Sequence, residues 1–212
     1  MKYKSPVSLI LLIAAPAVIC DTAYAKNTAD SSSGNAVIER GEDPETGLKY
    51  WQWDHDGFLL RLTQRLPDQT RGYFEARGFD QASRELLATS CVFQSMAKNS
   101  ASDPSHTLSA DLSEWQVISG EDKHSLLLRE YWQGIWQKRK VPDSARIGFN
   151  WSLLPSIVHY DINDYNWGMT SYGLPPGSHF DLLFSWEING KTYNGRINDV
   201  ICPDDIHPEP PS

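Results

Sequence analysis

The sequence predicts an α+β domain, built as an antiparallel β-sheet or small β-sandwich with a helical insertion of about three helices. Two observations predict the sheet. Apolar and polar residues alternate near both ends of the folded region, and an Asn189-Gly190 pair separates two long segments with strand patterns. A third observation predicts the helices, because apolar residues between the strand segments recur every three or four positions. Runs of strands and runs of helices within one domain are typical of the α+β class.

The strand segments are defined by alternation and by the turns between them. Asp56-Gly57 and Asn189-Gly190 are pairs in which both residues tolerate positive φ, so each favours a tight hairpin turn. Between residues 146 and 153 the apolar residues again occupy every second position. The predicted strands are 48–53, 58–63, 146–153, 180–188 and 191–201.

Three helices are predicted between these strands, at about 68–77, 81–98 and 128–140. Gly78 suits the position after a helix end, and Asp80 suits the N-cap of the next helix. In the third helix the apolar positions fall at i, i+3, i+4, i+7 and i+8, and Pro142 prevents continuation. The apolar face of this helix is therefore expected in the core.

The two ends of the chain differ in composition from the domain. Lys2 and Lys4 precede an apolar run of about 13 residues, and Ala23-Tyr24-Ala25 matches the small-x-small pattern of a signal-peptidase site. Cys20 leaves open a lipoprotein, although Val18 and Ile19 are bulky for that processing site. The expected organisation is a signal peptide at 1–25, a flexible segment at 26–36, a single domain at 37–202 and a proline-rich acidic tail at 203–212. The protein is thus expected to be periplasmic or secreted.

The cysteines support the same compartment. Removal of the leader leaves Cys91 and Cys202, which are expected to form a disulfide in an oxidising environment. A redox-active pair or metal ligation is the alternative, but neither cysteine lies in a Cys-x-x-Cys unit. The predicted bridge would fasten the second helix to the C-terminal hairpin.

Charge and hydropathy exclude several partners. The formal net charge is −8, and loss of the leader makes it one unit more negative. Such a chain is not expected to bind nucleic acid or an anionic membrane through a general field. No segment after the leader is long and apolar enough for a stable membrane span. The expected partner is an extracytoplasmic protein or a small ligand.

Residues 159–179 are predicted to form a long loop that carries the working surface. His159, Met169 and His179 are spaced evenly along it. Imidazole and thioether ligands suit copper, so these three residues are the candidate metal site and copper the candidate cofactor. Acidic residues at 161 and 164 give a weaker match to a calcium loop, which lacks the usual glycine and closing glutamate.

Aromatic residues give the second candidate site. The chain has 8 Trp and 9 Tyr, and several lie in or beside predicted loops. Side chains of this type anchor protein partners or stack on ligands when they are exposed. The candidate ligand-binding residues are Trp51, Trp53, Tyr165, Trp167 and Tyr172.

The sequence carries no motif that identifies a reaction. It has no Gly-x-Ser-x-Gly element and no phosphate-binding loop, so no catalytic residue is assigned. The interpretation is an exported, non-enzymatic binding or accessory protein that binds a transition metal at the long loop. A carbohydrate- or protein-binding module and an extracytoplasmic hydrolase with paired carboxylates remain the alternatives.

Overall fold

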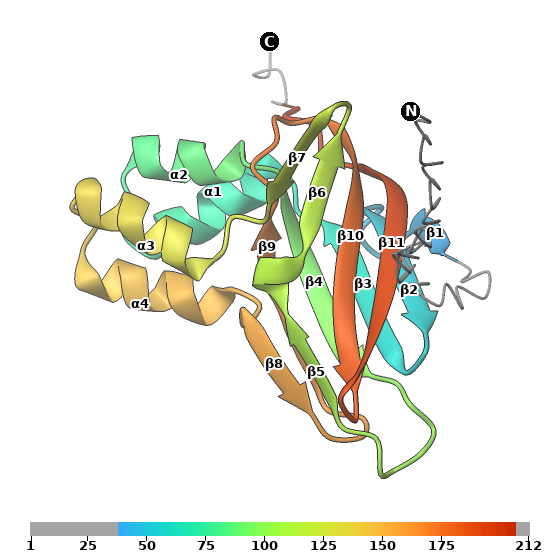
Figure 1. Cartoon of the computed structure of the whole chain (residues 1–212). Coiled ribbons are helices and arrows are strands. Elements are labelled where there is room, and N and C mark those ends of the chain that lie inside the picture. Colours follow the sequence, from blue (N-terminus) through green and yellow to red (C-terminus); the bar gives the residue numbers. More distant parts are fainter. Residues whose placement is uncertain (1–37, 207–212) are drawn as a thin grey trace, which may run out of the picture. The chain divides into compact units, whose positions relative to one another are not determined.

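Two antiparallel β-sheets and four helices make up residues 38–206, the part of the chain that the computed structural model describes (Figure 1). The predicted signal peptide at 1–25 and segment at 26–36 lie outside the described residues, as does the tail beyond residue 206. The β-rich α+β prediction agrees with this architecture in its coarse form. No helix within residues 38–206 is long and apolar enough to cross a membrane.

Sheet A contains five strands in the order β1-β2-β3-β4-β9, all paired antiparallel. Its strands are β1 (Glu39–Glu42), β2 (Lys49–His55), β3 (Phe58–Gln64), β4 (Val92–Asn99) and β9 (Tyr165–Ser171). Asp56 and Gly57 both have positive φ in the β2–β3 turn, as the hairpin prediction required. Along β3 every second residue is buried, so one face of the sheet looks into the core.

Sheet B is built around the long hairpin β10–β11. Strands β5 and β6 pair with the same edge of β10 at different heights and carry β8 and β7 on their outer sides. A single 3₁₀ turn, Leu112–Glu114, joins β5 to β6. The strands are β5 (Leu108–Asp111), β6 (Gln116–Ser119), β7 (Asp122–Ser125), β8 (Ile157–Tyr160), β10 (His179–Ile188) and β11 (Lys191–Ile201).

The main core lies between the two sheets and is largely aromatic. The Trp53 ring meets Phe184 edge-to-face at 5.2 Å between centroids, and Phe58 lies 5.2 Å from Trp186. Strands of both sheets supply these rings from their buried alternate positions. The buried rings hold the two sheets face to face as a sandwich.

The helices form a second cluster beside β4 and β9. They are α1 (Pro67–Glu75), α2 (Gln81–Ala88), α3 (Arg129–Lys138) and α4 (Asp143–Ser152). Trp132 and Trp136 of α3 stack at 5.0 Å and pack with Phe149 of α4, and Met169 of β9 joins the same cluster. The cluster therefore covers part of the outer face of sheet A (Figure 1).

The helices do not form the predicted single insertion. They come as two pairs, one between β3 and β4 and the other between β7 and β8. The predicted helix at 81–98 ends at Ala88, and its second half is strand β4. The sequence pattern did not predict strand β4, because two of its inward positions are polar. Ser95 shares a hydrogen bond with Thr170, and Asn99 donates to the carbonyls of His106 and Tyr160.

The predicted strand at 146–153 is wrong, because this segment belongs to α4. Ala145 and Phe149, one helical turn apart, are the buried residues, whereas Ile147 and Trp151 face outward. The period-two interpretation had placed all the large residues of this segment inside. Pro142 at the N-cap and Asp143 in the first turn were the helix signals in the sequence.

The predicted loop at 159–179 is also wrong in its length. It contains the end of β8, a four-residue turn, the whole of β9 and a connection at 172–178. Asn163 takes positive φ in the turn, so β8 and β9 follow each other closely although they belong to different sheets.

A disulfide joins Cys91 and Cys202, with a Cα–Cα distance of 5.1 Å. The prediction had placed Cys91 in a helix. It lies instead between α2 and β4, where its φ is +56°. Cys202 follows β11 directly and donates its backbone N–H to Ser178. The bridge therefore ties the start of a central strand of sheet A to the end of sheet B.

One core phenol predicts an alkaline limit to stability. Burial raises the pKa of Tyr172 to about 12, and hydrogen bonds with Thr170 and Ser95 oppose the shift only in part. The folded-state pKa exceeds the unfolded value near 10. The neutral, buried phenol therefore contributes its full stabilisation of the fold below pH ~10, and this contribution is lost as the pH rises towards 12. Tyr172→Phe is expected to remove roughly 2 kcal/mol of the alkaline loss. Urea unfolding at several pH values would show it, and Tyr165→Phe, which removes an exposed phenol, should leave the loss unchanged.

Candidate binding surfaces

The structure does not bring together the three candidate metal ligands. His159 is exposed on β8 and lies in register with Ser109, which is itself in register with Glu187 of β10. His179 lies at the other end of β10, eight residues from Glu187, a separation of about 26 Å along the strand. Met169 is buried under the helices on the other sheet. No common copper site exists among these residues.

Two of the three residues, His179 and Met169, make local contacts instead. The His179 Nδ1 lies 2.7 Å from the Asp199 carboxylate, and the Met169 carbonyl accepts a hydrogen bond from the Leu154 backbone. Within residues 38–206, no group of three or more His, Cys, Asp or Glu side chains is placed to hold a metal ion.

Three of the five candidate aromatic residues belong to the core. Trp51 and Trp53 are buried between the sheets, and the Trp51 indole donates to the Asp199 carbonyl. Tyr172 is completely buried, with its ring 4.7 Å from that of Phe180. These residues cannot meet a ligand at the surface. The alternation within β2 was the signal for burial of the two tryptophans, whereas the sequence around Tyr172 gave no such signal.

The other two aromatic residues are exposed on the outer face of sheet A. Tyr165 and Trp167 lie two residues apart on β9, so both point to the same side, and 57% and 68% of their surfaces are exposed. The register places Trp167 beside Met96 of β4, and Met96 beside Arg61 of β3. Trp167, Met96 and Arg61 thus form a row of neighbouring side chains across β9, β4 and β3.

A third exposed aromatic residue, missed in the sequence, comes from α4. Trp151 is 86% exposed in the last turn of this helix. Two residues later Leu153 forms a parallel bridge with Met169, and Trp167 stands two residues before Met169. The two tryptophans therefore come from segments that converge at one bridge. We call Arg61, Met96, Trp151, Tyr165 and Trp167 the aromatic platform.

A glycine makes this convergence possible. A Cβ atom on Gly168 would lie 2.3 Å from the Leu154 backbone nitrogen and 2.4 Å from the Leu153 carbonyl carbon. The backbone of residues 153–154 can therefore pass the edge of β9 only where the side chain is hydrogen. The close approach fixes the end of α4 against the strand that carries Trp167.

One cationic side chain, Arg61, belongs to the platform, and a second, Lys98, borders it. The Arg61 guanidinium stacks over the Tyr50 ring, 3.8 Å from its centroid, which holds it flat on the sheet. Lys98 is in register with Tyr165 and forms no salt bridge with any residue of the described part of the chain.

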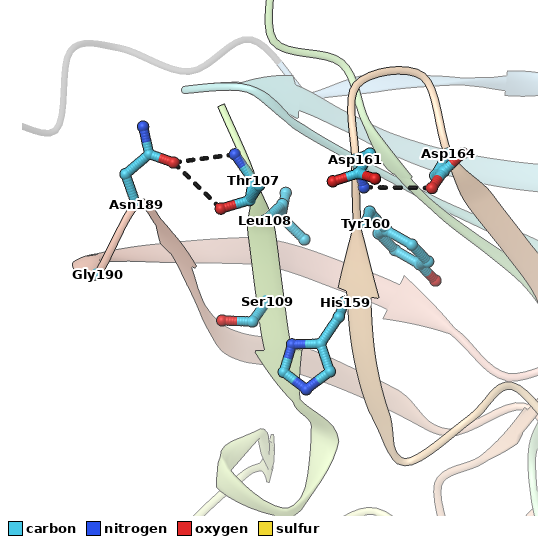
Figure 2. Close-up of a pocket in the computed structure, with 9 residues that line it drawn as sticks. All are labelled: Thr107, Leu108, Ser109, His159, Tyr160, Asp161, Asp164, Asn189 and Gly190. Atoms are coloured by element: carbon cyan, nitrogen blue, oxygen red, sulfur yellow. Dashed lines mark hydrogen bonds between the residues drawn. The ribbon is translucent and has the colours of Figure 1, made fainter. Parts of the chain in front are cut away.

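A polar cavity of about 300 Å³ lies on sheet B (Figure 2). Its lining comes from β5, β8, the turn after β8 and the β10–β11 turn. Asn189 accepts hydrogen bonds from the backbone and hydroxyl of Thr107 at one side. Asp161 and Asp164 lie at the other side, with Ser109 and His159 between. This cavity takes in His159, one of the three candidate metal ligands.

The architecture defines the protein as an antiparallel two-sheet sandwich with a helical cluster against one sheet. Comparisons with protein-family models, curated proteins and solved structures returned no match. Functional assignment therefore rests on the chemistry of these surfaces.

Proposed function

We propose that the protein works outside the cytoplasm as a non-enzymatic binding protein, and that it binds another protein through the aromatic platform. The observation that carries this proposal is the exposure of Trp167, which lies beside Met96 in the row that ends at Arg61, and of Trp151, whose segment bridges to the same strand. Trp, Tyr, Met and Arg are the residue types enriched in protein interfaces, and Trp, Tyr and Arg supply most hot spots. The disulfide supports an oxidising compartment.

The platform is also rigid, which favours affinity. Trp167 and Met96 lie on paired strands, and Arg61 is held by its stack on Tyr50. Side chains fixed in this way lose little conformational entropy when a partner binds. Ile147, 58% exposed one turn before Trp151 on the same side of α4, extends the apolar surface.

Site-specific photo-crosslinking in the native compartment tests the proposal. A benzophenone amino acid at position 167 or 151 is expected to give a discrete protein adduct, and the same group at Lys123 of β7 is not. An adduct with a second copy of the chain would make the partner the protein itself. Adducts equally frequent at all three positions, or none at 167 and 151, would contradict the proposal.

The identified partner then allows a quantitative prediction. Trp167→Ala and Trp151→Ala are each expected to weaken its binding by about 30-fold or more, because hot-spot truncation typically costs about 2 kcal/mol or more. Ile206→Ala removes an exposed apolar side chain outside the platform and is the matched control. Titration calorimetry with purified partner measures the three constants. Equal losses in all three variants would rule the platform out as the contact.

A further inference from the structure

Strand β9 is an edge strand of sheet A, and it differs from the other free edges of the two sheets (Figure 1). Natural sheets protect a free edge from pairing with another chain by charged side chains, bulges or short length. Strands β1, β7 and β11 carry charged residues, and β8 has only four residues. Strand β9 has seven residues, and none of them is charged. Among the strands that the structure describes, this edge is therefore the least protected against pairing.

Part of this edge has backbone groups that are open to a partner. The Met169 and Ser171 carbonyls point away from β4, where they accept hydrogen bonds from other segments of the chain. In an antiparallel strand every second residue directs both its N–H and its C=O to the same side. Tyr165 and Trp167 therefore direct theirs outward as well, and no described segment forms a backbone hydrogen bond with them on this side. Residues 153–154 close the edge only from Met169 onward.

The open part of the edge is self-complementary. When a second copy of β9 lies antiparallel to the first, with a two-fold axis at Asn166, Tyr165 of each copy lies opposite Trp167 of the other. Both residues of such a pair have outward N–H and C=O groups, so they can exchange both backbone hydrogen bonds. The same register brings Asn166 beside its own symmetry mate, and an amide side chain is both donor and acceptor. An isologous contact requires this kind of match between a surface and itself.

The side chains add apolar contact to this pairing. Tyr165 and Trp167 both point to the outer face of sheet A and are largely exposed. In the two-fold arrangement each tyrosine ring stands beside a tryptophan ring of the other copy, and aromatic cross-strand pairs stabilise a sheet. The platform row that ends in Trp167 continues across the axis into Tyr165 and Lys98 of the second copy. The pairing thus joins the two A sheets into one continuous sheet and covers the exposed aromatic side chains.

We infer that β9 is the site at which two copies of this chain associate, edge to edge, into a two-fold symmetric dimer. The inference rests on the proposed function, because it names a second copy of the chain as the protein that the aromatic platform binds. The open stretch is short, since residues 153–154 occupy the edge beyond Gly168. A contact of this size gives a reversible dimer rather than an obligate one.

Sedimentation velocity of residues 26–212 over a range of micromolar concentrations measures the association. The expected result is a monomer–dimer equilibrium that Asn166→Lys abolishes, because two positive side chains then lie directly opposite each other. Asn166→Asp is expected to abolish the dimer in the same way with two carboxylates. An equimolar mixture of the two variants should restore it, since each lysine then faces an aspartate. Asn194→Lys adds the same charge to an exposed position of β11, is the matched control, and should leave the equilibrium unchanged.

Tyr165→Pro tests the backbone part of the contact. Proline lacks the N–H that points to the second copy, and the first residue of an edge strand tolerates it. This variant is expected to dimerise at least about 10-fold more weakly than Tyr165→Ala, because each copy loses one hydrogen-bond donor.

The outcomes separate the dimer from the proposed function. A monomer at every concentration, a dimer that Asn166→Lys leaves intact, or a mixture of the two charge variants that stays monomeric would overturn the dimer. Photo-crosslinks from positions 151 and 167 to a different protein would then leave the proposed function standing without it. If neither position crosslinks and the chain is monomeric, both proposals fail.

Discussion

Replacement of Cys91 and Cys202 by alanine is expected to lower the free energy of unfolding by about 3–5 kcal/mol. The two cysteines are 111 residues apart, so the bridge closes most of the domain into one loop. A loop of this length strongly restricts the unfolded chain on the entropy model of disulfide stabilisation. The bridge also fixes the end of β11 beside the start of β4, where Gln64 donates a 2.8 Å hydrogen bond to the Ile201 carbonyl.

Urea unfolding followed by tryptophan fluorescence measures the effect. The wild-type protein in reductant is the control, because the reductant breaks the same disulfide without replacing a side chain. Both samples should unfold at similarly reduced urea concentrations. A loss below about 1 kcal/mol in both would show that the contacts around β11, and not the bridge, determine the stability of this end of sheet B.

Gly168→Ala is expected to destabilise the fold by about 2–4 kcal/mol, because the new methyl group meets backbone rather than flexible side chains. The atoms in its way belong to Leu153 and Leu154, which pair with β9 through the Leu154 N–H and the Met169 carbonyl. Relief of the clash must move this segment from the strand and with it the end of α4. The expected result includes a change in the fluorescence of the exposed tryptophans.

Gly134→Ala is the matched control for this prediction. Gly134 lies within α3, and no atom stands within 4 Å of the position that its Cβ would take. Alanine has the higher helix propensity, so this variant should gain up to about 1 kcal/mol. Thermal unfolding of the two variants therefore separates a steric effect from a general effect of replacing glycine. Similar melting temperatures for both would contradict the close approach at Gly168.

The sequence predicted those elements whose local pattern agreed with their final environment. The β2–β3 and β10–β11 hairpins follow from Asp56-Gly57 and Asn189-Gly190, because their turn residues and alternation act within a few positions. Helix α3 follows from its apolar period. In β4 and α4 the local pattern was misleading, since Ser95 is buried only because Thr170 lies opposite it and Trp151 is exposed at a place where a core residue was expected.

The candidate sites show the same division. Tyr165 and Trp167 were recognised as candidate binding residues, but Trp151 could join them only when the Leu153–Met169 bridge, which the absence of a side chain at Gly168 permits, brought the end of α4 to β9. His159 was predicted as a metal ligand, and the residue in register with it, Ser109, comes from a strand 50 residues earlier in the chain. Their even spacing along the sequence had suggested that His159, Met169 and His179 form one site. Strands are extended, however, so residues spaced evenly along them lie far apart.

The sequence by itself determined the alternating strands, their turns, the capped helices and the two cysteines that pair, because these depend on short-range sterics and on the number of available thiols. The tertiary structure alone decided which aromatic side chains stay exposed and which strand edges stay free. Burial and free edges depend on strand register and on which segments pack together. Register sums weak contacts between residues as many as 80 positions apart, as Leu108 and Ile188 are, and no local pattern in the chain contains that sum.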